Sequence, residues 1–203
     1  NLKLHNDAIE AYRQALQINP ENDFAWFSLG LAYGNLNQHN DAIEAYRQAI
    51  RINPKDAEIW NNLGNAYNEI NRNNDSVEAY RQAIRINPKD AVIWYNLGIA
   101  YYQINRNNDA IEAYLQALQI NPENAFAWNN LGIAYDDLKR YNNSIEAYRQ
   151  ALQINPEKAN TWYSLGVAYY LSGNRTAALD VVRELRRLDP ARADKLFNLL
   201  VPR

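Results

Sequence analysis

Three asparagines recur at one interval in this chain, because Asn62, Asn96 and Asn130 lie 34 residues apart. A carboxamide carries both a hydrogen-bond donor and an acceptor, so it can pair with a peptide backbone whatever the side chains are. An extended peptide has N–H and C=O groups that need such partners. One asparagine per interval therefore predicts a ladder that holds an extended peptide. The alternative is that the asparagines recur because the segments arose by duplication, and that they bridge neighbouring helices.

Other reactive chemistry is missing from the sequence. There is no cysteine, and we find no phosphate-binding glycine loop, metal-ligand cluster or nucleophile motif. His5 and His39 recur at the same interval, and one histidine per interval makes neither a catalytic triad nor a metal cage. We therefore expect no catalytic residue, no metal site and no cofactor, so the chain should not be an enzyme.

The interval of 34 residues extends over most of the chain. The segment NDAIEAYRQAIRINP begins at Asn40, and close copies begin at Asn6, Asn74, Asn108 and Asn142. Three residue types keep the same step: Pro20, Pro54, Pro88, Pro122, Pro156 and Pro190; Trp26, Trp60, Trp94, Trp128 and Trp162; Gly30, Gly64, Gly98, Gly132 and Gly166. A fixed period of this size predicts a solenoid of stacked units.

Each unit reads as two helices. In residues 23–56, apolar residues at helical spacing predict a first helix, A, over DFAWFSLGLAYGNL and a second, B, from near Asn40 to near Asn53. Asn40 is a suitable N-cap for helix B. Asn37 lies where a left-handed residue is expected after helix A, and Asn53–Pro54 should end helix B. Gly30 on helix A would let the two helices approach closely.

We divide the chain accordingly into seven parts. They are a half repeat with helix B only at 1–22, repeats at 23–56, 57–90, 91–124 and 125–158, an atypical last repeat at 159–192, and a C-terminal closing helix at 193–203. The last part carries Leu196, Leu199 and Leu200 at helical spacing. The alternative for it is a truncated sixth helix A.

The repeated residues resemble the tetratricopeptide repeat pattern. The matching positions in one unit are Trp26, Leu29, Gly30, Tyr33, Ala42, Tyr46, Ala49 and Pro54. The resemblance implies an all-α fold, a right-handed superhelical solenoid of antiparallel helix pairs, with the A helices lining a concave groove. It says little about function, because this fold hosts many partners.

The units differ most on the exposed side of helix A, which we call the A-helix strip. We expect the strip to bind the partner, with asparagines for the peptide backbone, aromatic residues for apolar anchors and acidic residues for basic side chains. The residues are Asn61, Asn62, Asn65, Asn96, Asn129 and Asn130; Phe24, Phe27, Tyr95, Tyr102, Tyr163 and Tyr170; Glu58 and Asp137. Phe126 and Asp136 lie on it too, whereas lysine and arginine are missing from it.

The composition restricts the partners. The net charge is −2, so no nucleic acid or anionic membrane is expected as a partner. No apolar run is long enough to cross a bilayer and no signal peptide is visible, from which we expect a cytoplasmic location. Carboxylate-clamp members of the family bind acidic C-terminal peptides through lysine and arginine, so the resemblance implies that this strip, which lacks both, does not.

We therefore expect a non-catalytic protein-interaction scaffold that binds an extended peptide or partner segment, neutral to basic with apolar anchors, in the groove. A second interpretation is a substrate-recognition arm of a larger enzyme, since the asparagine ladder is similar to that of the O-linked N-acetylglucosamine transferases. A third is self-assembly into a homo-oligomer through the N-terminal edge, where Ala8, Tyr12, Ala15 and Leu16 form an apolar flank.

Overall fold

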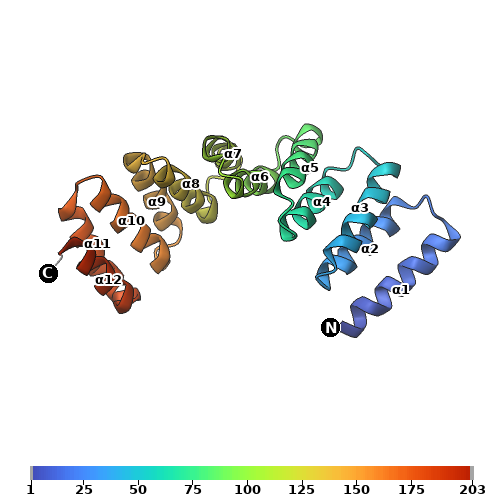
Figure 1. Cartoon of the computed structure of the whole chain (residues 1–203), viewed down its shortest axis with the longest axis horizontal. Helices are drawn as coiled ribbons and strands as arrows, with labels where there is room; N and C mark the ends of the chain where they lie inside the picture. The colour runs from blue at the N-terminus through green and yellow to red at the C-terminus, as the bar shows by residue number, and fades with distance from the viewer. Residues whose placement is uncertain (1, 202–203) are drawn as a thin grey trace. The chain divides into compact units, whose positions relative to one another are not determined.

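The computed structural model describes residues 2–201, and the side chains of residues 4–201. This part of the chain is built from twelve α-helices and contains no strand (Figure 1). The chain divides into two compact units, residues 1–104 and 105–203. The first unit holds α1 (Leu2–Ile18), α2 (Asp23–Asn35), α3 (His39–Ile52), α4 (Ala57–Glu69), α5 (Asn73–Ile86) and α6 (Ala91–Gln103). The second holds α7 (Asn107–Ile120), α8 (Ala125–Asp137), α9 (Tyr141–Ile154), α10 (Ala159–Leu171), α11 (Arg175–Leu188) and α12 (Pro190–Leu200).

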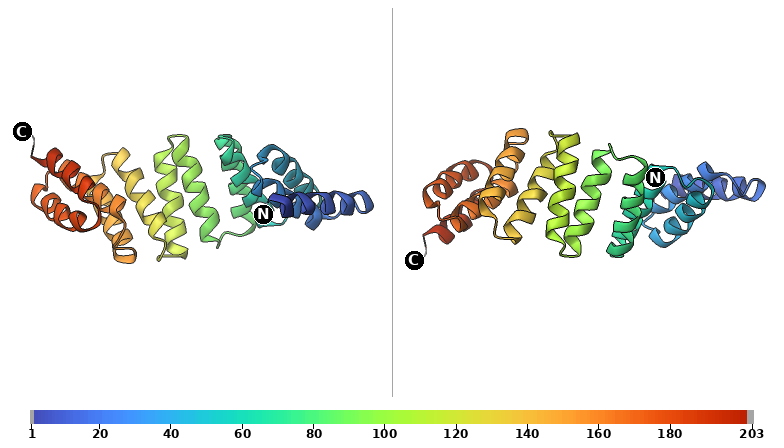
Figure 2. Two further views of the ribbon diagram at one scale, coloured as in Figure 1. Left: turned by 90° about the horizontal axis from the view of Figure 1, so that it is seen from below. Right: turned by 90° about the horizontal axis from the view of Figure 1, so that it is seen from above.

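Within each unit, every helix packs against the helices that precede and follow it in the chain. Figure 2 shows the helices of each unit following one another side by side. In the first unit α2 pairs with α3 and α4 pairs with α5, and in the second α8 pairs with α9 and α10 with α11. The expected all-α helical-repeat solenoid is therefore confirmed, and α2, α4, α6, α8 and α10 are its A helices.

The turn from helix A to helix B closes through one left-handed residue. Its members have φ angles of 57° to 59° and are Asn37, Asn71, Asn105 and Lys139, while Gly173 takes the same place in the last pair. In the first turn the Gln38 amide donates to the Tyr33 carbonyl oxygen at 2.9 Å. Asparagine adopts this conformation at lower cost than most residues, which is why it recurs here.

The expected N-cap of helix B was wrong by two residues. Helix α3 begins at His39, its N-cap is Gln38, and no side chain caps it. Helices α5, α7 and α9 start in the same way, after Arg72, Arg106 and Arg140. Of the A helices, α2, α4, α6 and α8 do have side-chain caps, as where Asp56 accepts from the amides of Glu58 and Ile59, whereas α10 has none.

A glycine on helix A gives room to a tyrosine ring on helix B. A Cβ atom added to Gly64 would lie 2.6 Å from Cε1 of Tyr80, and one added to Gly132 would lie 2.5 Å from Cε1 of Tyr148. In the last pair Val182 replaces the tyrosine, and Leu196 of α12 lies against Gly166 instead. Helix α12 thus supplies the side chain that helix B lacks.

Consecutive repeats are joined by two recurring hydrogen bonds. The indole Nε1 of each tryptophan donates to the carbonyl oxygen of the proline six residues before it, at 2.7–3.0 Å. In the first unit, Arg13 of α1 donates to the hydroxyl of Tyr33 on α2, and Arg47 of α3 donates to Tyr67 on α4. These bonds fix each helix A against the preceding helix B and so position the A-helix strip.

Candidate functional site

The A-helix strip of the first unit presents exposed apolar and acidic side chains. Phe24 is 69% exposed and Val92 is 58% exposed, and Glu58 is exposed between them in the chain. Phe27 is half-buried and packs on Tyr46, with ring centroids 6.0 Å apart. Exposed large apolar side chains that recur on one face mark an interaction surface more often than isolated ones do.

The asparagines of this unit form a hydrogen-bonded network between neighbouring A helices. Asn96 Nδ2 of α6 donates to Oδ1 of Asn61 at 3.1 Å and to Oδ1 of Asn65 at 3.3 Å, both on α4. Asn62 Nδ2 donates to the carbonyl oxygen of Glu58 at 2.9 Å. The amide nitrogen of Asn96 therefore bridges two neighbouring helices, as the alternative interpretation of the asparagines expected. The Oδ1 atoms of Asn62 and Asn96 accept no hydrogen bond from residues 4–201.

Tyr95 and Tyr102 complete the predicted set in the first unit. Both are half-buried on α6, and both already make contacts within the protein. A hollow of about 180 Å³ opens on the same strip and is lined by residues of α2, α3 and α4, Asn62 and Asn65 among them. The structure thus brings the predicted residues of the first unit onto one surface that includes a recess.

In the second unit the strip has a different character, because cations lie over its aromatic rings. The Lys158 ammonium is 5.5 Å from the centre of the Phe126 ring, and the Lys195 ammonium is 5.5 Å from that of Tyr163. The sequence analysis missed both lysines, since neither is on the exposed side of a helix A: Lys158 precedes α10 and Lys195 is on α12. The strip itself carries no lysine or arginine, but in the second unit two lysines from outside the strip lie over its aromatic rings.

The asparagines of the second unit also hold neighbouring helices together. Thr161 Oγ1 of α10 donates to Asn129 Oδ1 of α8 at 2.9 Å, and Asn129 Nδ2 lies 3.5 Å from Asn130 Oδ1. Asn130 makes further contacts within the protein. A small hollow of about 140 Å³ lies beside Asn129 and Phe126. The remaining predicted residues, Tyr163, Tyr170 and Asp137, are half-buried, 37% exposed and exposed, respectively.

Asp136 is a carboxyl group held in a partly apolar setting. Its Oδ2 atom accepts from the Tyr148 hydroxyl at 2.8 Å, while Oδ1 is buried with no partner among the described residues. Burial raises the pKa of Asp136, and the hydrogen bond from Tyr148 opposes this rise. Burial, followed by the nearby Asp136 charge, also raises the pKa of Tyr148, so the tyrosine stays protonated at neutral pH.

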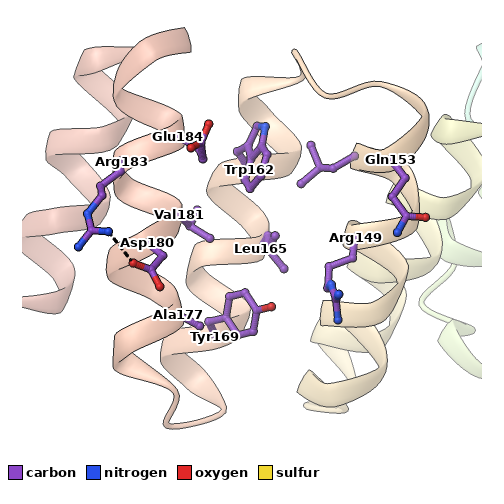
Figure 3. A pocket seen from close by; sticks show the side chains of 11 residues that line it. Arg149, Gln153, Trp162, Leu165, Tyr169, Ala177, Asp180, Val181, Arg183 and Glu184 are labelled. Atoms are coloured by element: carbon purple, nitrogen blue, oxygen red, sulfur yellow. Dashed lines mark ion pairs between the residues drawn. The ribbon is translucent and has the colours of Figure 1, made fainter.

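Two larger hollows lie away from the strip, between successive B helices. One, of about 550 Å³, is in the second unit between α9, α10 and α11, with Trp162, Leu165 and Val181 among its walls (Figure 3). The other, of about 510 Å³, is in the first unit and has the equivalent walls Trp26 and Leu29. The sequence analysis missed them because the Glu and Arg stripe of helix B indicates a solvated face. On the rim of the first hollow, Asp180 and Arg183 form an ion pair of 3.1 Å (Figure 3).

The N-terminal helix is more covered than its sequence suggested. Leu16 is buried, and Ala8, Tyr12 and Ala15 are half-buried. Among the described side chains of α1, the large apolar residues that are exposed are instead Leu4 and Ile18, near its two ends.

The described residues form neither a metal site nor a membrane-spanning helix. Across the described side chains, no three His, Asp or Glu groups lie close enough together to hold a metal ion. Within residues 2–201, no helix has both the length and the apolar character needed to span a membrane.

Comparison with known proteins places this architecture in a family. A family model described as TPR repeat matches residues 5–37, 35–70 and 64–105, and one described as Tetratricopeptide repeat matches residues 91–124 and 125–158. A comparison with curated protein sequences found no match.

Solved structures share the fold. The crystal structure of MamA protein matches with a TM-score of 0.80 and 26% identity, over 86% of this chain and 96% of that one. YrrB, described as a TPR protein with an unusual peptide-binding site, matches with a TM-score of 0.82 and 18% identity, over 94% and 99% of the two chains. PilF of Pseudomonas aeruginosa matches with a TM-score of 0.75 and 19% identity, over 96% and 99%. At the 18% and 19% identity of YrrB and PilF, the similarity concerns the fold alone. Since the family models cover well over half of its residues, this chain belongs to the tetratricopeptide repeat family.

Proposed function

We propose that this protein is a non-catalytic interaction scaffold that binds an extended peptide along its A-helix strip. The family membership and the structural neighbours support a role in protein interaction. The observation that carries the finer proposal is the state of the strip amides. The nitrogens of Asn62 and Asn96 are held by the protein, so the oxygens of these two amides are oriented and remain free to accept.

Such oriented oxygens can accept hydrogen bonds from the backbone N–H groups of an extended peptide. Each amide N–H of the peptide that finds an oxygen contributes about 0.5–1.5 kcal/mol. Phe24 and Phe27 lie on the same strip as apolar anchors for side chains of the peptide. The exposed carboxylates Glu58 and Asp137 favour neutral to basic segments over acidic ones.

The test is selection of ligands from a displayed library of random peptides, followed by calorimetry on the peptides retained. The triple variant Asn62→Ala, Asn96→Ala and Asn130→Ala should bind them at least about tenfold more weakly, because several backbone hydrogen bonds of the size given above are lost together. The matched control is Asn40→Ala, Asn74→Ala and Asn142→Ala, which removes three exposed asparagines from one position of the B helices.

The control should keep the affinity of the unchanged protein, and circular dichroism checks that both triple variants remain folded. Full affinity in the folded strip variant would contradict the role of the ladder. Failure of the library to yield any ligand, or retention of acidic C-terminal peptides in preference to basic ones, would contradict the wider proposal.

Self-association through α1 is less well supported. Its exposed apolar residues, Leu4 and Ile18, are at opposite ends of a helix of 17 residues. They do not form the contiguous patch that an interface needs.

A further inference from the structure

One tyrosine of the repeat has lost the hydrogen bond that its counterparts make. The hydroxyl of Tyr80 donates to Asn65 Oδ1 at 2.7 Å, and that of Tyr148 donates to Asp136 Oδ2 at 2.8 Å. Tyr46 occupies the same position in the first full repeat and is only 3% exposed. Its hydroxyl has no hydrogen-bond partner among the described side chains and backbone. The hydroxyl oxygen is not among the buried polar atoms that lack a partner, so it stays accessible to a ligand.

The cause is the local sequence of α2. Leu31 occupies the position that Asn65 has on α4, and Gly34 occupies the position that Asp136 has on α8. Neither can accept from Tyr46. The missing side chain at Gly34 also leaves the recess of about 180 Å³ on the strip, and Tyr46 is one of its walls. A Cβ atom added to Gly34 would lie 3.9 Å from the Tyr46 hydroxyl, so this hydroxyl faces the recess.

The walls of the recess are rich in acceptors. The Glu69 carboxylate is exposed and forms no ion pair with the described residues. The Asn62 oxygen is free, since only the nitrogen of that amide is bonded. Ala42, Ala66 and the edge of Leu31 supply apolar surface. His39 also lines the recess, whereas lysine and arginine do not.

This combination selects against two classes of side chain. A carboxylate would enter beside Glu69 with no lysine or arginine to pair with, which is costly. A purely apolar side chain would leave the Tyr46 hydroxyl without a partner. A basic side chain suits the acceptors of the recess, because its donors can reach the oxygen atoms of Glu69, Asn62 and Tyr46 and its stem is apolar.

We propose that the recess at Gly34 binds one basic side chain of the peptide, with its cationic group between Glu69, Asn62 and Tyr46. The proposal rests on peptide binding to the A-helix strip and adds a specificity pocket to it. The Tyr46 hydroxyl accepts one hydrogen bond from the cation, the Glu69 carboxylate neutralises the charge, and the alanines contact the stem. The equivalent places in the third and fifth repeats hold Tyr102 and Tyr170, so they offer no such open position.

The experiment compares a library-selected peptide with the same peptide in which norleucine replaces each lysine in turn. Norleucine keeps the apolar stem and removes the ammonium group. One lysine should be required by the unchanged protein, with a loss of about tenfold in affinity, or about 1.4 kcal/mol. Where the selected peptide has arginine at that position, citrulline is the neutral replacement.

Two variants remove the pocket chemistry without changing its shape. In Tyr46→Phe and Glu69→Gln, affinity for the lysine peptide should fall several-fold, and the loss on norleucine replacement should shrink. Gly34→Tyr, which copies Tyr102 and Tyr170, should fill the recess and abolish the preference. The matched control is Tyr148→Phe, whose hydroxyl is bonded to Asp136, and it should bind like the unchanged protein.

The outcomes separate this inference from the proposed function. The pocket would be overturned if the retained peptides need no basic residue, or if the need for a basic residue persists in all three variants. Peptide binding to the strip would still stand in either case. The complete absence of retained peptides would overturn both. A basic requirement that disappears in the folded variants, as judged by their melting curves, supports the pocket.

Discussion

The packing of Tyr46 on Gly30 predicts that two neighbouring glycines respond oppositely to one substitution. A Cβ atom added to Gly30 would lie 2.6 Å from Cδ1 and 3.0 Å from Cζ of the Tyr46 ring, and closer still to Cε1. The ring is buried and cannot withdraw towards solvent. At Gly34, one turn further along α2, the added atom would meet only the Tyr46 hydroxyl at 3.9 Å, an ordinary contact.

The magnitude follows from comparing the two variants. Replacing glycine by alanine within a helix gains about 1 kcal/mol in either case. Overpacking of a core costs about 1–3 kcal/mol, and only Gly30→Ala incurs it. The free energy of unfolding of Gly30→Ala should therefore be about 1–3 kcal/mol below that of Gly34→Ala. Gly34→Ala should be at least as stable as the unchanged protein.

Thermal unfolding followed by circular dichroism measures this difference. For a chain of this length, 1 kcal/mol corresponds to about 2–4 °C in melting temperature. The double variant Gly30→Ala with Tyr46→Leu tests the cause, because removing the ring relieves the clash. Its loss of stability should be smaller than the sum of the two single losses. Equal melting temperatures for Gly30→Ala and Gly34→Ala, or additive losses in the double variant, would refute the packing argument.

Two further predictions concern the second unit. Because burial raises the pKa of Asp136 above its ordinary value of 3.8, the folded state holds that proton to a higher pH than the unfolded chain and loses stability as the pH rises through the raised pKa. Asp136→Asn keeps an oxygen for the Tyr148 hydroxyl, so its melting temperature at pH 7 should be higher than that of the unchanged protein. The difference in melting temperature should shrink as the pH falls towards 3.8. A difference that does not depend on pH would contradict this. Leu196→Ala should lower the free energy of unfolding by about 2–5 kcal/mol, because Leu196 is fully buried against Gly166. Leu199→Ala should lower it by less than about 0.5 kcal/mol, because Leu199 is 40% exposed. Similar melting temperatures for the two variants would contradict the closing role of α12.

The sequence by itself determined the repeat architecture, because its signals are local. Helical spacing within each segment and the step of 34 residues predicted the helix pairs, and the asparagine at Asn37 and its equivalents predicted the left-handed turns. The start of helix B was misplaced at Asn40. There the turn is closed by the backbone bond from Gln38 to Tyr33, and α3 begins at His39 without a side-chain cap.

The sequence also predicted the A-helix strip from local spacing. The positions of Trp26, Leu29 and Gly30 indicate the buried side of helix A, and the strip is the opposite side. What those exposed residues do was decided by neighbouring helices. Asn96 is oriented by two asparagines on another helix, and Phe126 lies beneath Lys158, which is 32 residues later in the chain and immediately precedes α10. Such contacts join residues about one repeat apart and leave no trace in helical periodicity.

The tyrosines show this division most clearly. Tyr46, Tyr80 and Tyr148 look equivalent in the sequence, and all three are buried against a glycine of helix A. Two of the hydroxyls find an acceptor on the facing helix and the third does not. The periodic sequence determines that a ring is buried at each position. Only the tertiary structure decides whether its polar end has a partner, because a hydrogen bond depends on which side chains of the facing helix come within about 3 Å of it.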